Sequence, residues 1–525
     1  MKQVSRRAGY ASRWLGVAAL GCILSLALYQ IWELPPRWSA IVVIAVAAIA
    51  VSMCLVHVFS DLLLVASLFC LPIASFVKWV APSDYPLESY PQAVLSGLFH
   101  IGILDFVLVG LYASWFYRVF VTRQETLPRH FNLLDGFILW LIAAYALTAF
   151  GSVEPGLGLS ATAFHLKYAL FYFYLSRHLE ERHLPWLIAA FMFTIVVETV
   201  LGSYQFATGR LVGLSLDKGH GSDQILNTLG TVPGQGSYHR ATGTLTEPHV
   251  FGEFMEMLLP FFGVLFLTPL LRPGLRMLSL VASAGAALMI LFSLSRGAYI
   301  GVAVSLVLGA VLILVLWRER QVVPALAIVV LLAALAAPFT AHLLVDRLTV
   351  SLDTLTGRYP VYWMAVRVFT QYPLFGVGAG NWMYAYPHYD QQWLVLDTYS
   401  DLIHNDILLI AAELGLFGLI PYLSIILSAM LRLFTVARQR RDLAGRLALA
   451  ALMAMIAAEV NNQVDPGIHE PSVALLLWIV ISFSVALPRL RPGAGAILMV
   501  PTGPTGRALP APAVAAGRAV GCDGE

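Results

Sequence analysis

Apolar stretches of roughly 20 residues, separated by short polar turns, fill most of the chain between residues 14 and 488. A stretch of that length, wound as an α-helix, crosses the hydrocarbon core of a bilayer. We place fourteen of them, at 14–32, 39–59, 62–81, 94–117, 131–150, 162–177, 185–207, 249–270, 277–294, 298–316, 322–339, 404–431, 446–462 and 471–488. The sixth is the shortest and contains Lys167, so it could lie in the interface instead. The pattern predicts an all-α, polytopic membrane protein with about 12–14 transmembrane helices.

Composition excludes a water-soluble protein. Hydrophobic residues make up 59% of the chain, charged residues only 12%, and the mean hydropathy is +0.78. Soluble domains average about 25% charged residues. The net charge of +2 gives no indication of a nucleic-acid partner. Of the four cysteines, three lie in apolar runs and Cys522 lies near the end of the chain, a spacing that predicts neither a disulfide framework nor a metal site.

The distribution of basic residues predicts the orientation. With both termini in the cytoplasm, 22 of the 32 lysines and arginines fall on inner segments, as the positive-inside rule requires. Arg6, Arg7 and Arg13 precede the first apolar run, which continues to Trp32 and is followed by many others. We therefore interpret this run as an uncleaved first transmembrane helix rather than a signal peptide. The chain is expected in the bacterial inner membrane.

Loop lengths divide the chain into three parts. Residues 1–207 form N-terminal transmembrane helices, 208–490 form a transmembrane region with two long outer loops, and 491–525 form a Gly-, Pro- and Ala-rich tail predicted to be disordered. The two outer loops span 208–248 and 340–403, and the second alternates aromatic residues with charges as expected for short interfacial helices. Because the long loops lie on the outer face, the functional site of the protein is expected there.

Four strings on that face carry candidate chemistry. HRATGTLTEPHVFGEFMEMLLP (239–260) carries Arg240 near its start, and SLSRGAYIGVAVSLVLG (293–309) places Arg296 in a break between two apolar spans. An arginine at membrane depth costs about 3 kcal/mol on insertion scales and needs an anionic partner; the alternative for Arg296 is a side chain that snorkels to the interface. GRYPVYW…PLFGVGAGNW (357–382) supplies Arg358 and a Gly-rich turn. That turn is not a dinucleotide fingerprint, since no strand precedes it.

The fourth string, YSDLIHNDILLIAAELGLFGLIPYL (399–423), places His404 and Asn405 at the start of a long apolar helix. On such a helix Asp401 stands one turn before His404 and could orient its imidazole, whereas Glu413 is rotated by about 180°. Ser400 or Asp401 could cap the helix. A histidine at this place could also be simply a polar residue at the boundary between the membrane and water, without a catalytic role.

Taken in order, these strings resemble the O-antigen ligase and polymerase superfamily of bacterial lipid-linked glycan transferases. The resemblance covers roughly residues 239–423, and its most specific part combines PLFGVGAGN with HND and AELGLFG. The chain departs from it at TEPHV (246–250), where relatives tend to have asparagine near His249.

The resemblance implies a donor glycan on undecaprenyl diphosphate and transfer to the hydroxyl of an acceptor glycolipid or glycan at the outer face. A guanidinium matches a diphosphate bidentately, so Arg240 and Arg296, with Arg358 in second place, are candidates for the diphosphate site. A base that is neutral near pH 7 suits the acceptor hydroxyl, so His404 takes that role with Asp401 or Asn405 positioning it. No cofactor is expected, and the partners are the lipid-linked glycan, the acceptor and the bilayer.

Several alternatives remain open. A metal-dependent mechanism would need acidic outer-loop residues such as Asp84 and Glu88, and Asp465, His469 and Glu470 of the last outer loop could bind an ion or acceptor, although solvated turn residues are the more ordinary interpretation. The intramembrane acids Asp105, Glu198 and Glu459 raise the possibility of a polysaccharide transporter or flippase. Within the transferases, the sequence does not separate a ligase from a polymerase or a protein O-oligosaccharyltransferase.

Overall fold

The computed structural model describes residues 58–74, 77–80, 99–125, 131–211, 239–245, 247–269, 271–320, 323–324, 358–382, 403–465, 467 and 469–491. Within these ranges, nine helical segments are long and apolar enough to cross a membrane. They are α5 (Ile103–Phe116) with its π-helical extension η3 (Tyr117–Val121), α6 (Leu133–Phe150), η4 (Glu181–His183) with α8 (Leu184–Thr208), α9 (Pro248–Phe266), α10 (Pro273–Ser293), α11 (Arg296–Leu312) with η5 (Ile313–Trp317), α14 (Asp406–Gln439), α15 (Leu443–Asn461), and α16 (Pro471–Ala486) with η8 (Leu487–Arg489). The predicted all-α, multi-pass membrane protein is confirmed. The predicted spans 14–32 and 39–59, and almost all of 322–339, lie outside the described residues.

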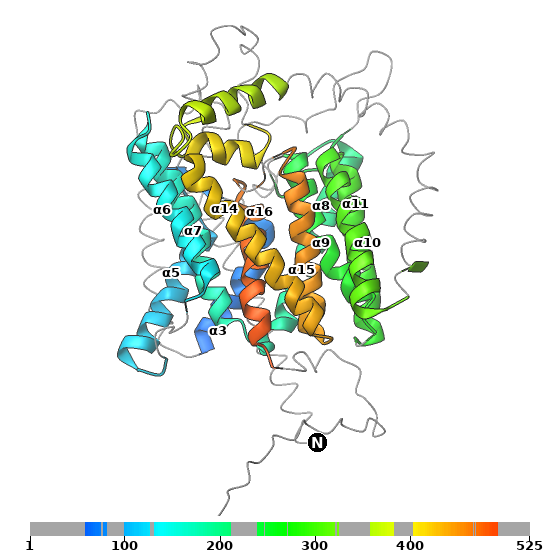
Figure 1. The fold of residues 1–525 in the computed structure, drawn as a ribbon. Helices are drawn as coiled ribbons and strands as arrows, with labels where there is room; N and C mark the ends of the chain where they lie inside the picture. The colour runs from blue at the N-terminus through cyan, green and yellow to red at the C-terminus, as the bar shows by residue number, and fades with distance from the viewer. Residues whose placement is uncertain are drawn as a thin grey trace, which may run out of the picture.

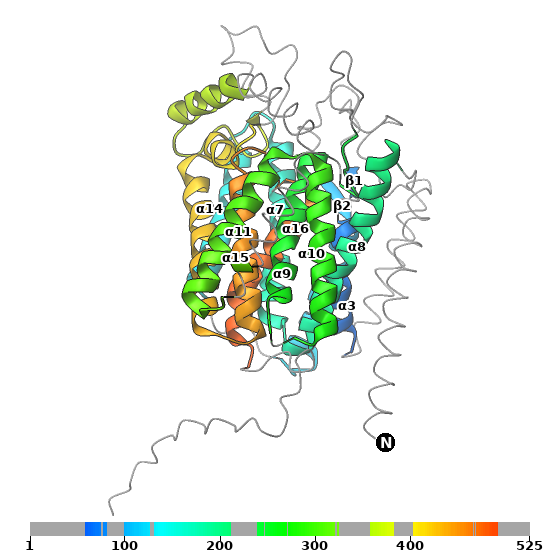
Figure 2. The same ribbon diagram turned by 90° about the vertical axis from the view of Figure 1, so that its right-hand side faces the viewer.

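The helices form an upright bundle with α9, α15 and α16 at its centre (Figures 1 and 2). α9 packs against α10 and α15, α11 against α15, α14 against α6 and α15, and α16 against α7. The peripheral helices α10 and α11 turn apolar side chains such as Val281 and Val307 outward. Apolar side chains exposed around a bundle are the surface that lipid tails cover, since hydrocarbon solvates them.

α7 (Pro155–His178) is longer than the predicted 162–177 and links the two ends of the bundle, from the end of α6 to the start of η4 and α8. It is not one of the nine segments selected by hydropathy. Its Lys167 Nζ lies 3.3 Å from Asp105 Oδ2 of α5 and near the ring of Tyr168. The charge that made this span doubtful is therefore paired inside the protein.

Two predicted spans are wrong at their ends. The span 62–81 is a shorter helix, α3 (Val58–Phe69), followed by the 3-10 turn η1 (Leu71–Ile73) and strand β1 (Val77–Val80). The span 94–117 begins instead with strand β2 (Phe99–Gly102), which pairs antiparallel with β1. Pro72 supplies no backbone N–H to continue α3, and hydropathy alone does not distinguish short apolar strands from helix.

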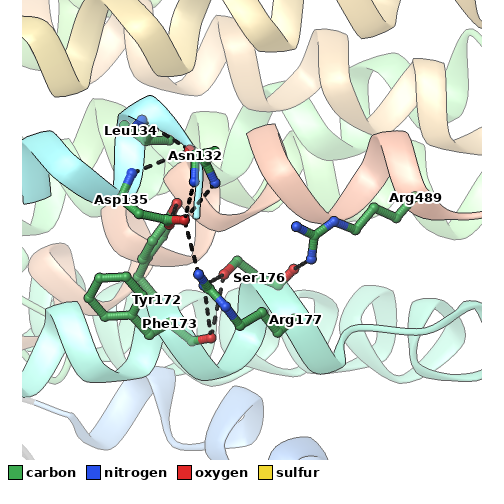
Figure 3. A network of polar contacts seen from close by, with 8 residues as sticks. All are labelled: Asn132, Leu134, Asp135, Tyr172, Phe173, Ser176, Arg177 and Arg489. Atoms are coloured by element: carbon green, nitrogen blue, oxygen red, sulfur yellow. Dashed lines mark hydrogen bonds and ion pairs between the residues drawn. The ribbon is translucent and has the colours of Figure 1, made fainter. Parts of the chain in front are cut away.

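One end of the bundle gathers the starts of α9, α11, α14 and α16 and the ends of α10 and α15. We call this the site end; it is uppermost in Figure 1. At the opposite end a polar network joins α6, α7 and η8 (Figure 3). Asp135 accepts hydrogen bonds from Tyr172 Oη at 2.8 Å and Arg177 Nη2 at 3.0 Å, and Arg489 Nη1 donates to the carbonyl of Ser176 at 3.1 Å. This network holds the helices at a fixed spacing far from the site end.

Candidate active site

The turn that carries Arg240 is held by two buried polar side chains of α8. Gln205 Oε1 accepts hydrogen bonds from the backbone N–H groups of Thr242 and Gly243, at 3.0 and 2.8 Å. Glu198 accepts from the backbone N–H of Thr244 at 2.9 Å and from its hydroxyl. These bonds give the backbone N–H groups of the turn their hydrogen-bond acceptors. Glu198 is therefore paired with the turn and is not an isolated intramembrane acid.

Arg240 is thereby aimed at the break between α10 and α11. Its Nε donates to the carbonyl of Ser293 at 2.9 Å. In that break Leu294 adopts a left-handed conformation (φ 50°), and Ser295 caps α11 by accepting from Ala298 N at 3.4 Å. Arg240 and Arg296 therefore flank the same break.

Arg296 is the first residue of α11, and the glycine after it sets how closely that helix approaches α15. A Cβ on Gly297 would lie 1.8 Å from Asn461 Oδ1, so a larger residue would require the Asn461 side chain to move. The side chain of Arg296 is partly exposed, and no described residue forms a hydrogen bond or ion pair with its guanidinium. A guanidinium that forms no hydrogen bond or ion pair with a described carboxylate is suited to bind an anion.

The helix over residues 358–371 brings Arg358 to the same end. Its Nη2 lies 2.8 Å from Asp465 Oδ1, and its Nη1 donates to the carbonyl of Val464 at 2.8 Å. One turn further on, Tyr362 Oη donates to the carbonyl of His404 at 2.7 Å. Arg358 also lies within electrostatic range of Arg296, as does Asp465. The second-rank candidate thus lies at the centre of the site.

His404 lies two residues before α14 rather than inside it, and Asp465 is its partner. His404 Nδ1 and Asp465 Oδ1 are 3.0 Å apart. If Nδ1 carries the proton that Asp465 accepts, the lone pair of the neutral ring is on Nε2. That arrangement leaves Nε2 as the nitrogen able to take a proton from a substrate, with a carboxylate behind the ring.

Asp465 joins His404 to Arg358 and is almost completely buried. Burial by itself would raise the pKa of its carboxyl, but the charges of His249, Arg358 and His404 and the hydrogen bond from His404 together lower that pKa well below its ordinary value. The carboxylate therefore stays ionised across the physiological range. The interpretation of Asp465 as a solvated turn residue was wrong, because the turn after α15 folds inward between α14 and the helix over 358–371.

The remaining positioning candidates have separate outcomes. Asn405 is the N-cap of α14: its Oδ1 accepts from Leu408 N at 2.9 Å and its Nδ2 donates to Gln463 Oε1 at 3.1 Å. It fixes the chain next to His404, and it replaces the cap expected from Ser400 or Asp401. Asp401 lies outside the described residues, and so do Asp84 and Glu88.

Two glycine turns lock the site end together. Near residue 415 α14 bends, with Gly415 at φ 61°, and the turn 372–382 docks against the bend. Glu413 accepts from the backbone N–H groups of Gly380 and Trp382, at 2.9 and 3.2 Å. A Cβ on Gly376 (φ +63°) would lie 2.4 Å from the backbone of Glu413. The PLFGVGAGN and AELGLFG strings thus contact each other directly, and this explains why both need glycine.

Comparison with known protein families gives a match over part of the chain. Residues 281–423 match the model of the O-antigen ligase family. The matched segment includes Arg296, Arg358 and His404 but neither Arg240 nor Asp465. Among curated proteins, none matches the chain. The resemblance to the O-antigen ligase superfamily is confirmed over the matched residues, which indicates a lipid-linked glycan transferase family in a membrane setting.

Proposed function

We propose that this protein transfers a glycan from undecaprenyl diphosphate to an acceptor hydroxyl at the outer face of the bacterial inner membrane, as an O-antigen ligase-like enzyme. The observation that carries the proposal is the His404–Asp465–Arg358 chain of contacts beside Arg296, at one end of the bundle. A base, its orienting carboxylate and a set of guanidinium groups are what this reaction requires.

The reaction is a single displacement. The acceptor oxygen bonds to the anomeric carbon as the bond from that carbon to the diphosphate oxygen breaks, and its electron pair leaves with the diphosphate. The hydroxyl proton passes to Nε2 of His404, and Asp465 stabilises the imidazolium that forms. Attack from the face opposite the leaving group inverts the anomeric configuration.

Guanidinium groups supply the counter-charge in this proposal. Arg296 lies where it can contact the diphosphate, and Arg240 flanks the same break. Arg358 forms an ion pair with Asp465, so it helps to position the carboxylate that orients the base, and it adds positive potential to the site. Permanent positive charges aimed at the leaving oxygens can act as a divalent cation would, so we propose a metal-independent reaction; full transfer in excess EDTA is its direct test.

The charge distribution supports the orientation. The end opposite the site carries Arg118, Arg177, Arg182, Arg272, Arg276, Arg318, Arg440, Arg446 and Arg489. A cytoplasmic location for that end follows the positive-inside rule and puts the site end outside, where the glycan carrier presents its cargo. Both chain termini are then cytoplasmic.

Deleting the protein tests the proposal and separates its variants. Bare lipid A-core with long chains stranded on the carrier would identify a ligase, and core capped by one repeat would identify a polymerase. Intact surface polysaccharide with unglycosylated proteins would identify a protein O-oligosaccharyltransferase. Intermediates trapped on the cytoplasmic leaflet would refute transfer and favour a flippase. If His404→Ala restored normal glycan in the deletion strain, His404 would not be the base.

A further inference from the structure

The helix over 358–371 has an exposed outer face that the reaction as described does not use. Tyr359, Trp363 and Arg367 follow one another at four-residue spacing, so they form one line along the helix. Tyr359 is 71% exposed and Trp363 is 49% exposed, and Arg367 is exposed as well. We call these three residues the aromatic stripe. A contiguous group of large exposed aromatic side chains is typical of an interaction surface.

The inner face of the same helix holds the proposed base and its carboxylate in place. Arg358 Nη2 lies 2.8 Å from Asp465 Oδ1, and Tyr362 Oη donates to the carbonyl of His404 at 2.7 Å. The apolar side chains of this face form a small core of their own, made by Val361, Met364, Ala365, Val368, Trp382, Ile403, Leu409 and Ala412. These contacts fix the helix, so the aromatic stripe is a preformed surface.

The aromatic stripe lies on the acceptor side of the site. Trp363 directly follows Tyr362, the residue that contacts the backbone of His404. In Figure 1 the helix, drawn in yellow-green, lies over the start of α14, whereas α10 and α11 stand on the other side of the bundle. The break between those two helices carries the proposed donor residues Arg240 and Arg296. A molecule that rests on the stripe is therefore placed beside the base rather than beside the diphosphate site.

The chemistry of the aromatic stripe suits a sugar chain. A pyranose ring has an apolar C–H face that can stack on an aromatic ring, and a rim of hydroxyl groups that need hydrogen-bond partners. The guanidinium of Arg367 lies 5.8 Å from the centre of the Trp363 ring, so a sugar on that ring is within reach of its N–H donors. Tyr359 and Trp363 are separated by about 6 Å along the helix axis, which lets neighbouring sugars of one chain each meet a ring.

The level of the helix favours a sugar chain over lipid as the occupant. Aromatic side chains also anchor proteins at the membrane boundary. Both views, however, draw the helix over 358–371 beyond the ends of α11 and α14 (Figures 1 and 2). It therefore lies past the part of the bundle whose apolar exterior lipid tails cover.

We infer that the aromatic stripe binds the sugar chain of the acceptor glycolipid, the core oligosaccharide of lipid A-core, and so presents its hydroxyl to His404. The inference rests on the proposed function and deepens it, because a protein acceptor would offer the stripe no sugar chain. Trp363 is its central contact, since it stands between Tyr359 and Arg367 on the stripe.

Binding of the lipid-free acceptor sugar isolates this surface. The probe is the core oligosaccharide, released from lipid A by mild acid and taken from the deletion strain, and the protein is the full chain in detergent. We expect Trp363→Ala to raise the Kd about 10- to 100-fold, the range for loss of a central aromatic contact. Trp363→Phe keeps a ring for stacking and should stay within about threefold of the wild type.

Phe116→Ala is the matched control. Phe116 is 56% exposed and ends α5 at the opposite end of the bundle, so this variant loses a comparable exposed ring away from the stripe. Its Kd should equal that of the wild type. Because Trp363 and Phe116 are both exposed, neither variant should unfold the protein, and melting temperatures verify this.

Three results would overturn the inference. The first is a Kd for the core oligosaccharide that Trp363→Ala leaves unchanged, or no binding of that probe to the wild type. The second is dependence on Trp363 only for the glycan released from the carrier, which would assign the stripe to the donor. The third is quenching of the Trp363 emission, taken as wild type minus Trp363→Phe, by acyl-brominated lipids in nanodiscs, which would place the stripe in the membrane. In each case the proposed function stands if the wild-type gene, and not His404→Ala, restores normal glycan in the deletion strain.

Discussion

Replacing Asp465 with asparagine removes one negative charge from the centre of the site at almost no change in volume. Two contacts depend on that charge, at 3.0 Å to His404 Nδ1 and 2.8 Å to Arg358 Nη2. An asparagine has one accepting oxygen for the two donors, and its NH₂ group turned toward the ring would favour the tautomer with the proton on Nε2. That tautomer cannot accept a proton from the acceptor hydroxyl.

The magnitude follows from what the carboxylate supplies. A hydrogen bond to a charged group contributes about 1.5–3 kcal/mol, and the side chain of Asp465 is only 10% exposed, so water screens little of it. At about 1.4 kcal/mol per factor of ten, loss of the His404 contact alone lowers kcat roughly 10- to 100-fold. The added loss of stabilisation of the imidazolium brings the expected decrease to about 100- to 1,000-fold. The donor KM should change little, because the arginines remain.

Membranes from the deletion strain provide the assay, since they contain the natural donor and acceptor. Purified protein is added, and the decline of carrier-linked glycan is followed by mass spectrometry across a pH series. The acid limb of the rate profile should move to lower pH in Asp465→Asn, because the carboxylate no longer favours the imidazolium. A purely structural role would not produce that shift.

Asp442→Asn is the matched control. Asp442 pairs with Arg440 at the opposite end of the bundle, so the variant loses a comparable ion pair away from the site. We expect its kcat to equal that of the wild type. A kcat for Asp465→Asn within about threefold of the wild type, or no lower than that of Asp442→Asn, would refute the role of Asp465.

Three further predictions concern the scaffold, the donor site and acid stability. Gly376→Ala places a Cβ 2.4 Å from the backbone of Glu413 at φ +63°, and it should lower the unfolding free energy by about 2–5 kcal/mol. The control is Gly263→Ala, whose Cβ meets nothing within 4 Å. Equal melting temperatures for the two variants would contradict the close contact between the 372–382 turn and α14. Arg296→Lys keeps the charge but loses the bidentate geometry, so kcat/KM for the donor should fall about 10- to 100-fold; an unchanged value removes Arg296 from the diphosphate site. Because the pKa of Asp465 is lower in the fold than in the unfolded chain, its stabilising contribution is complete above about pH 4 and is lost at lower pH. The melting-temperature gap between wild type and Asp465→Asn should therefore shrink from pH 5 to pH 3, and a constant gap would show that the charge is not its source.

The sequence predicted most of the helices because each is encoded locally. Apolar runs near 20 residues give α6, α8, α9, α10, α11, α15 and α16 within a few residues. It was wrong where a short apolar segment could be either strand or helix, at β1 and β2. The span predicted at 404–431 began two residues too early, because Asn405 supplies the cap of α14, and it ended eight residues before the end of that helix at Gln439.

The sequence predicted those residues of the site whose type and position are unusual by themselves. Arg296 and Arg358 are conspicuous since a charge in or beside an apolar span needs a reason. Asp465 lies 61 residues from its partner His404, in a polar loop that looks like any solvated turn. Only the packing of α14 against α15, with Asp406 N donating to the carbonyl of Asn462 at 3.0 Å, brings that loop beneath the histidine.

Close packing between elements also explains why several glycines lie near the proposed reactive groups. Arg296, Arg358 and His404 come from three separate elements, and their spacing has to be kept within a fraction of an ångström for the transfer to proceed. Contacts through long side chains would let that spacing vary, whereas direct contact between two backbone segments keeps it fixed. Gly376 and Gly415 hold the 372–382 turn against the backbone of α14, and Gly297 of α11 lies against the side chain of Asn461 in α15. The glycines are thus part of the proposed site although they take no part in the proposed reaction, and a single methyl group at one of them should reduce transfer without altering any of the proposed reacting groups.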